Sequence, residues 1–126
     1  MAGADEFFVL GMDLENASRE TLDALRKPMQ KSAEEVRDGW RAGVRAKAPK
    51  HLPHLPAAIT HETKVSAGNV VADIGPESGK KQGRFGRGEE LGSRNQPPHL
   101  SGLSAFEAAQ EGLSRAAADS IGEVIP

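Results

Sequence analysis

Apolar residues recur at intervals of three or four along residues 17–48, which is the spacing of one face of an α-helix. The residues on this face are Leu22, Leu25, Met29, Ala33, Val36, Trp40 and Val44. Trp40 is the only tryptophan of the chain, and a large aromatic side chain buries more apolar surface than most others. We therefore expect a long helix whose apolar face anchors the core through Trp40.

The sequence also predicts where this helix begins and ends. Asn16 or Ser18 can cap its start, because a short side-chain oxygen can accept a hydrogen bond from the first-turn amides. Ala48-Pro49 ends it, since a proline disfavours helical geometry in the residue before it. Pro28 lies inside the pattern without breaking its phase. We expect either one bent helix or two nearly collinear halves, with the bend close to Lys27.

A β-hairpin is predicted after the helix. Apolar and polar residues alternate along residues 58–66, a second apolar stretch covers residues 70–75, and Pro76 stops it. The turn between them, residues 67–69, contains residue types that tolerate a positive φ. Before the hairpin, residues 51–56 carry a proline at every third position and predict a loop.

The remaining segments give weaker signals. Residues 7–10 are a short apolar run ended by Gly11, and we expect an edge strand or an arm that docks on a neighbouring subunit. Residues 89–93 predict a short strand or a turn of helix. A closing helix is capped by Ser101, or by Ser104 with Glu107 in a capping box. Its apolar face comprises Leu103, Phe106, Ala109, Leu113, Ala117, Ile121 and Val124.

Composition limits the class of protein. The 126 residues suffice for one domain, and the predicted helices and strands make it a small α+β domain. Only 37% of residues are hydrophobic and five are aromatic, so we expect some stabilisation from neighbouring subunits. Cysteine is absent, which excludes disulfides and thiolate metal sites. The start lacks the features of a signal peptide and no apolar run has membrane-spanning length, so we expect a soluble intracellular product.

Charge is unevenly distributed along the chain. Residues 1–18 carry four acids and no base, residues 19–50 carry nine bases and five acids, and the remainder carries seven bases and nine acids. An acidic N-terminal segment beside a basic helix suits subunits that meet with opposite potentials. An ordinary solvated surface is the alternative.

Two basic segments are candidates for contact with DNA or with neighbouring subunits. Arg37, Arg41 and Arg45 follow one another at helical spacing and could face DNA phosphates or acidic partner residues. Residues 79–88 are rich in glycine and predict a flexible basic loop that could follow a polyanion. The bases of this loop are Lys80, Lys81, Arg84 and Arg87. A solvated helix flank and a flexible loop without a ligand are the alternatives.

The sequence argues against an enzyme and against a metal site or cofactor. The segment from Gly75 to Lys81 does not have the glycine spacing of a phosphate-binding P-loop, and Lys81 stands where that motif needs Ser or Thr. His51 and His54 lie in a proline-rich segment and lack the ligand spacing of a zinc site. No nucleophile–base arrangement or carboxylate pair is set on an identifiable scaffold.

Short motifs follow one another in a recognisable order. They are Ala48-Pro49 after a long basic helix, Ile74-Gly75-Pro76 at the end of a hairpin, Glu90-Leu91-Gly92-Ser93 after a glycine-rich segment, and Gln96-Pro97-Pro98-His99 before a closing helix. In this order they resemble the tail-completion family of long-tailed bacteriophages, also called neck or head–tail joining proteins. The resemblance covers residues 14–122, preceded by residues 1–13 as a strand or arm, and the ordered set of motifs carries it.

The chain departs from the family pattern in two places. The family commonly has Thr-Gly and a leucine after Ala-Pro, where this chain has residues 51–56. It also commonly continues Pro-Pro-His with Pro-Phe, where this chain has Leu100-Ser101-Gly102. An aromatic residue usually found before Glu-Leu-Gly is supplied here by Phe85.

The resemblance implies an α+β subunit in which a long N-terminal helix and a C-terminal helix pack on a small, mainly antiparallel sheet. It also implies a structural virion protein without an active site. Such subunits form a homo-oligomeric ring, six-fold or alternatively twelve-fold, at the neck of the particle. Head connector or stopper proteins lie on one side and the tail terminator or tail tube on the other, and genomic DNA passes through without sequence-specific contact. The ring is assembled in the host cytoplasm, and no membrane is involved. A tail-terminator ring and a free nucleic-acid-binding accessory protein are the alternatives.

Overall fold

The computed structural model describes residues 8–13, 18–47, 50, 52–66, 68–92 and 98–124. It confirms the predicted α+β class, with a long N-terminal helix, a C-terminal helix and a small antiparallel sheet. The elements, in chain order, are β1 (Phe8–Asp13), α1 (Arg19–Lys47), α2 (Leu55–Ala58), β2 (Ile59–Ser66), β3 (Asn69–Pro76), the 3-10 helix η1 (Gly83–Phe85), α3 (Gly86–Leu91) and α4 (Ser101–Val124).

The sheet has three strands in the order β1-β3-β2, and both pairings are antiparallel. The predicted hairpin is confirmed: β2 and β3 pair from Ile59 with Pro76 to Ser66 with Asn69, and Gly68 in the turn has φ 77°. The predicted edge strand is also confirmed as β1. We expected this strand to end at Gly11, but its pairing with β3 continues to Asp13. Glycine can remain in the strand because the hydrogen bonds between strands are made by backbone groups.

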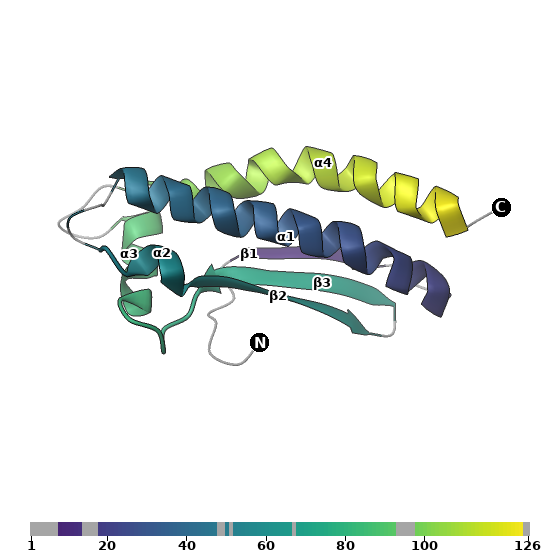
Figure 1. Ribbon diagram of the computed structural model, residues 1–126, viewed down its shortest axis with the longest axis horizontal. Helices are drawn as coiled ribbons and strands as arrows, with labels where there is room; N and C mark the ends of the chain where they lie inside the picture. Colours follow the sequence, from purple (N-terminus) through teal and green to yellow (C-terminus); the bar gives the residue numbers. More distant parts are fainter. Residues whose placement is uncertain are drawn as a thin grey trace.

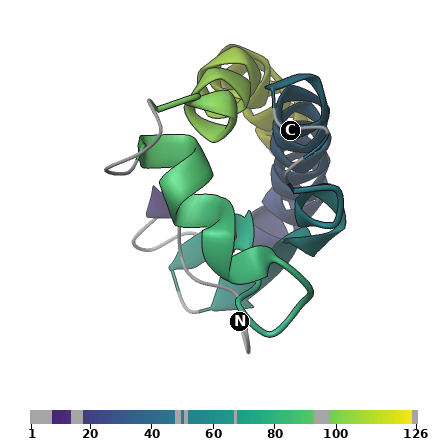
Figure 2. The same ribbon diagram turned by 90° about the vertical axis from the view of Figure 1, so that its left-hand side faces the viewer.

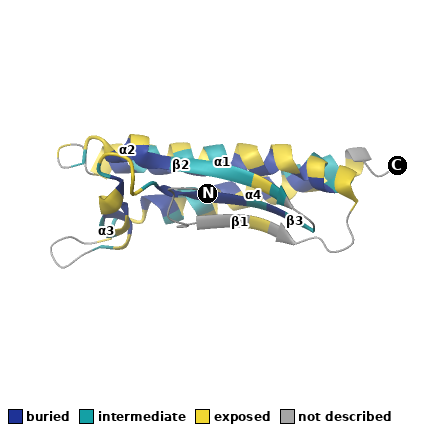
Figure 3. Cartoon of the chain, turned by 90° about the horizontal axis from the view of Figure 1, so that it is seen from below, coloured by how far each residue is buried: buried dark blue, intermediate teal, exposed yellow. Residues whose placement is uncertain are grey.

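Both long helices lie on the same side of the sheet and run in opposite directions (Figure 1). α1 packs on β2 and β3, and α4 packs along α1 (Figure 2). Seen from below, the sheet has β3 between β1 and β2, with the helices behind it (Figure 3). The core therefore lies between one layer of helices and one layer of strands.

The apolar face predicted for α1 is confirmed, since every residue assigned to it is buried. Trp40 is only 1% exposed and lies in the same cluster as Ile74 of β3 and Ala109 of α4. Of the two predicted alternatives, one helix or two nearly collinear halves, the structure has the first, because α1 is continuous through Pro28. Of the two predicted caps, Ser18 is observed: its Oγ accepts a hydrogen bond from the Thr21 amide at 3.1 Å. Asn16 lies outside the described residues.

Small residues allow α1 and α4 to approach closely. A Cβ added at Gly43 would lie 2.6 Å from Ser101 Cβ, and one added at Gly39 would lie 3.0 Å from Ala105 Cβ. Gly39 and Gly43 are four residues apart on α1, as are Ser101 and Ala105 on α4, so each pair lies on one face of its helix. This crossing fixes the distance between the two helices.

Gly43→Ala is therefore expected to destabilise the protein although alanine is the better helix former. Overpacking costs about 1–3 kcal/mol and the gain in helix propensity is about 1 kcal/mol, so the net loss should reach up to about 2 kcal/mol. The matched control is Gly112→Ala in α4, where an added Cβ meets nothing within 4 Å and should stabilise. Urea unfolding of the two variants measures the difference. Equal gains in stability would contradict the close crossing.

Candidate functional site

Segments that carry the sequence motifs meet at one end of the molecule, which we call the motif end. It comprises the end of α1 at Lys47, the end of β3 at residues 74–76, α3, and the residues 98–100 that lead into α4. Figure 1 shows these segments gathered at the left of the molecule, and Figure 2 views this end directly. Ala48, Pro49, Ser93 and residues 94–97 lie outside the described residues.

Glu90 caps α4 from a different element. Its side chain is fully buried, and its two carboxylate oxygens accept hydrogen bonds from the amides of Gly102 at 2.7 Å and Leu103 at 2.8 Å. A carboxylate at this position pairs two first-turn amides and complements the positive end of the helix dipole. The predicted capping box was wrong: α4 begins at Ser101, so Ser104 already lies inside its first turn.

Glu89 joins α3 to the segment before α4. Its buried Oε1 lies 2.8 Å from His99 Nδ1, and the backbone amides of His99 and Leu100 donate to the carbonyls of Glu89 and Glu90 at 3.1 Å. Lys47 Nζ donates to the His99 carbonyl, which brings in the end of α1. A buried carboxylate needs such a partner, because an unpaired charge out of water is strongly disfavoured. Sequence reasoning noticed His99 as part of a motif but missed its pairing with Glu89.

The glycine-rich segment is not a loop throughout, which corrects the prediction for residues 79–88. A turn covers residues 78–82, and η1 and α3 then form a helical segment from Gly83 to Leu91. Two of its glycines are required by close contacts. A Cβ at Gly86 would lie 2.5 Å from Pro76 Cγ, and one at Gly83 would lie 1.8 Å from the Glu77 carbonyl oxygen. These glycines therefore allow tight packing against the end of β3.

The four basic residues of this segment all lie on the surface. Lys80, Lys81, Arg84 and Arg87 are exposed. Lys80 Nζ is 3.8 Å from Glu77 Oε2, and the Arg84 guanidinium carbon lies 4.9 Å from the centre of the Phe85 ring. All four side chains are thus exposed at the motif end, two of them with a neighbouring side chain of the same segment as partner.

The predicted basic row on α1 has two different environments. Arg41 Nε and Nη2 donate to the Ile59 carbonyl at 3.0 and 2.7 Å, and Arg37 Nη1 lies 3.2 Å from His61 Nδ1. Both side chains are thus held against β2, whereas Arg45 is exposed. The row therefore holds α1 on the sheet at two of its three positions.

The pKa values near this row follow from the same contacts. The hydrogen bond from Arg37 lowers the pKa of Asp38, and burial lowers the pKa of Arg41. Burial, followed by the charge of Arg37, lowers the pKa of His61, which favours the neutral imidazole. A neutral Nδ1 can accept the hydrogen bond from Arg37.

Neither a metal centre nor a membrane span is evident in the described part of the chain. Over residues 8–13, 18–47, 50, 52–66, 68–92 and 98–124, no group of three or more histidine or acidic residues could hold a metal ion. Within the same residues, no helix is both long enough and apolar enough to cross a bilayer.

Comparisons with family models, with curated proteins and with solved structures found no match to this chain.

Proposed function

We propose that the protein is a structural subunit of a bacteriophage neck, where copies form a ring that joins the head connector to the tail tube around the DNA passage. The observation that carries the proposal is the meeting of the motif segments at one end. Pro76 packs against Gly86, and His99 and Leu100 are bound to α3 through Glu89 and Glu90. The described parts of motifs that are far apart in the sequence thus lie together in one structural unit. This is expected if the motifs specify the fold of the family that they resemble.

The function we propose is assembly rather than catalysis. Two strands, β1 and β2, are sheet edges, and the two long helices lie on one side of the sheet. Edges and open faces of this kind can be covered by neighbouring subunits. A ring closes when each subunit uses two different surfaces, one toward each neighbour. We propose six copies, with twelve as the alternative, and stopper or connector proteins and the tail terminator or tail tube as axial neighbours.

A free nucleic-acid-binding protein is the second candidate function. The exposed bases of residues 80–87 favour it, since Lys and Arg side chains supply most of the affinity for phosphate. Arg37 and Arg41 weaken it, because both are held against β2 and give little surface to a polyanion. A tail-terminator ring would use the same fold and the same surfaces.

Titration of labelled duplex DNA separates the neck subunit from the free DNA binder. A passage through which the genome slides needs no tight phosphate contacts, so binding should stay in the non-specific range of about 10⁻⁴ to 10⁻⁶ M at physiological salt. The four-site variant with Lys80, Lys81, Arg84 and Arg87 replaced by Ser should fold normally and bind almost as weakly. Fluorescence anisotropy at two salt concentrations measures both proteins.

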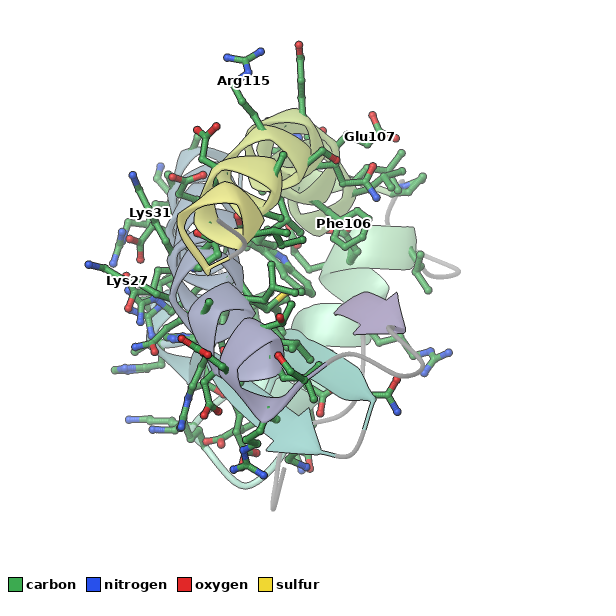
Figure 4. All side chains as sticks on the ribbon, turned by 90° about the vertical axis from the view of Figure 1, so that its right-hand side faces the viewer. Lys27, Lys31, Phe106, Glu107 and Arg115 are labelled. Carbon is green, nitrogen blue, oxygen red and sulfur yellow. The ribbon has the colours of Figure 1, made fainter. Side chains whose placement is uncertain are left out.

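The matched control replaces Lys27 and Lys31, two exposed bases of α1, by Ser (Figure 4). Nanomolar binding by the wild type that falls steeply with salt and disappears in the four-site variant, but not in the control, would favour the DNA binder over the neck subunit.

A further inference from the structure

The large exposed apolar side chains of the described residues gather at the motif end. They are Phe85, Leu91 and Leu100, which are 44%, 51% and 37% exposed. Phe85 belongs to η1, Leu91 ends α3, and Leu100 precedes α4. Single exposed apolar residues are common on surfaces, but a group confined to one end indicates a surface that contacts another molecule.

Exposed basic residues lie in the same chain segment as Phe85 and Leu91, and the described acidic residues of that segment are buried or partly buried. Glu89 and Glu90 are buried, with His99 and the α4 amides as partners, and Glu77 is partly buried beside Lys80. We call this surface the basic–apolar end. It comprises Lys80, Lys81, Arg84, Phe85, Arg87, Leu91 and Leu100. Its partner should be acidic and should offer apolar or small residues.

The apolar composition points to a protein partner rather than to nucleic acid. Single-stranded nucleic acids are bound by aromatic side chains on which the nucleobases stack, and phosphates are bound by Lys and Arg side chains and by polar hydrogen-bond donors. Two of the three exposed apolar residues, Leu91 and Leu100, are aliphatic and serve neither purpose. Aliphatic and aromatic side chains that lose water on contact are typical of the centre of protein interfaces.

The chain itself carries a complementary surface on the side of α4 that faces away from α1. Glu107 and Glu111 are exposed there, together with the small residue Ala118. Arg115 is the exposed base of this helix among the described residues, and it lies 3.7 Å from Glu111. Figure 4 shows that Glu107 and Arg115 point away from the body of the protein, whereas Phe106 points inward. We call this surface the acidic α4 face.

We infer that the basic–apolar end of one copy docks on the acidic α4 face of a second copy. The two surfaces belong to different parts of the subunit, so the contact is heterologous, and its repetition links copies in one direction. Opposite charge guides the docking, and burial of Phe85, Leu91 and Leu100 against this face holds it. The inference rests on the proposed ring, for which it names the surfaces that meet.

Two variants of the full chain test this contact, and each of them changes one of the two surfaces. The end variant carries Arg84→Ser, Phe85→Ser and Leu91→Ser, and the face variant carries Glu107→Lys and Glu111→Lys. The control is Lys27→Ser with Lys31→Ser, because these exposed bases lie on α1 outside both surfaces (Figure 4). Circular dichroism and thermal unfolding show that each variant is folded, and sedimentation velocity measures association.

The wild type and the control should associate beyond a dimer, and each test variant alone should associate at least tenfold more weakly. An equimolar mixture of the two variants retains one intact end and one intact face, so it should form a one-to-one heterodimer that does not grow. Added salt should weaken both assemblies.

Three outcomes would overturn the inference. One is a wild type that stays monomeric up to about 1 mM, the scale of the weakest specific complexes. Another is an equimolar mixture of the two variants that stays monomeric. The third is an end variant or a face variant that associates like the wild type. If such an end variant has lost affinity for duplex DNA, the basic–apolar end is assigned to nucleic acid. None of these results tests whether the protein lies in the neck, which a particle reconstruction decides separately.

Discussion

Trp40→Ala is expected to lower the free energy of unfolding by about 3–5 kcal/mol, the range for truncating a large buried aromatic side chain. Trp40 is 1% exposed and lies where α1 meets both the sheet and α4. Its removal would leave a cavity that two layers border, and the surrounding helices cannot close it without losing the Gly43 crossing. Urea unfolding followed by circular dichroism measures the change.

Phe85→Ala is the control for this prediction, because Phe85 is 44% exposed and its truncation should change stability by less than about 1 kcal/mol. If Trp40→Ala also loses less than about 1 kcal/mol, the apolar face of α1 does not anchor the core and the account of the fold is wrong.

Glu90→Ala is expected to lower the free energy of unfolding by about 2–6 kcal/mol, because two amides of α4 lose their hydrogen-bond partner and each such loss costs about 1–3 kcal/mol. The variant should also detach residues 98–100 from α3, since the cap and the backbone bonds act on the same segment. Hydrogen exchange of the Gly102 and Leu103 amides should become faster. Glu90→Gln keeps one acceptor oxygen, so its free energy of unfolding should fall by less than that of Glu90→Ala.

The matched control is Glu111→Ala on the exposed side of α4, which should change stability by no more than about 0.5 kcal/mol. Similar losses in Glu90→Ala and Glu111→Ala, together with unchanged exchange at Gly102 and Leu103, would show that Glu90 does not hold the start of α4.

The sequence was most informative where structure depends on neighbours along the chain. The apolar face of α1 and the alternation in β2 are local patterns, and both correspond to observed elements. The Ser18 cap is also local, because its partner Thr21 lies three residues away. The α+β class followed from these elements alone.

Contacts between distant segments were beyond local reasoning. The glycines of residues 83–86 predicted flexibility, but their role depends on Pro76 and Glu77, which reach them only in the folded chain. The cap of α4 comes from Glu90 rather than from a nearby serine. The spacing of Gly39 and Gly43 on α1 could have indicated a close helix crossing, and the sequence reasoning did not use it.

The candidate site was predicted in part. Its basic residues were identified, and Lys80, Lys81, Arg84 and Arg87 are exposed as a partner surface requires. The roles of Arg37 and Arg41 depend on β2, which no local pattern places beside them. The exposed Phe85, Leu91 and Leu100 could not be separated from buried apolar residues by sequence, because hydrophobicity does not reveal which side of an element meets solvent.

The central claim is the proposal that the protein is a subunit of a bacteriophage neck. An averaged cryo-electron microscopy reconstruction of phage particles whose genome carries this sequence would test it most directly. The account predicts a closed ring of copies between the head connector and the tail tube, with DNA on the ring axis. In each subunit density, α1 and α4 should cover one face of a three-stranded sheet. A neck fully accounted for by other proteins, with this chain absent from the particle or located elsewhere in it, would contradict the account.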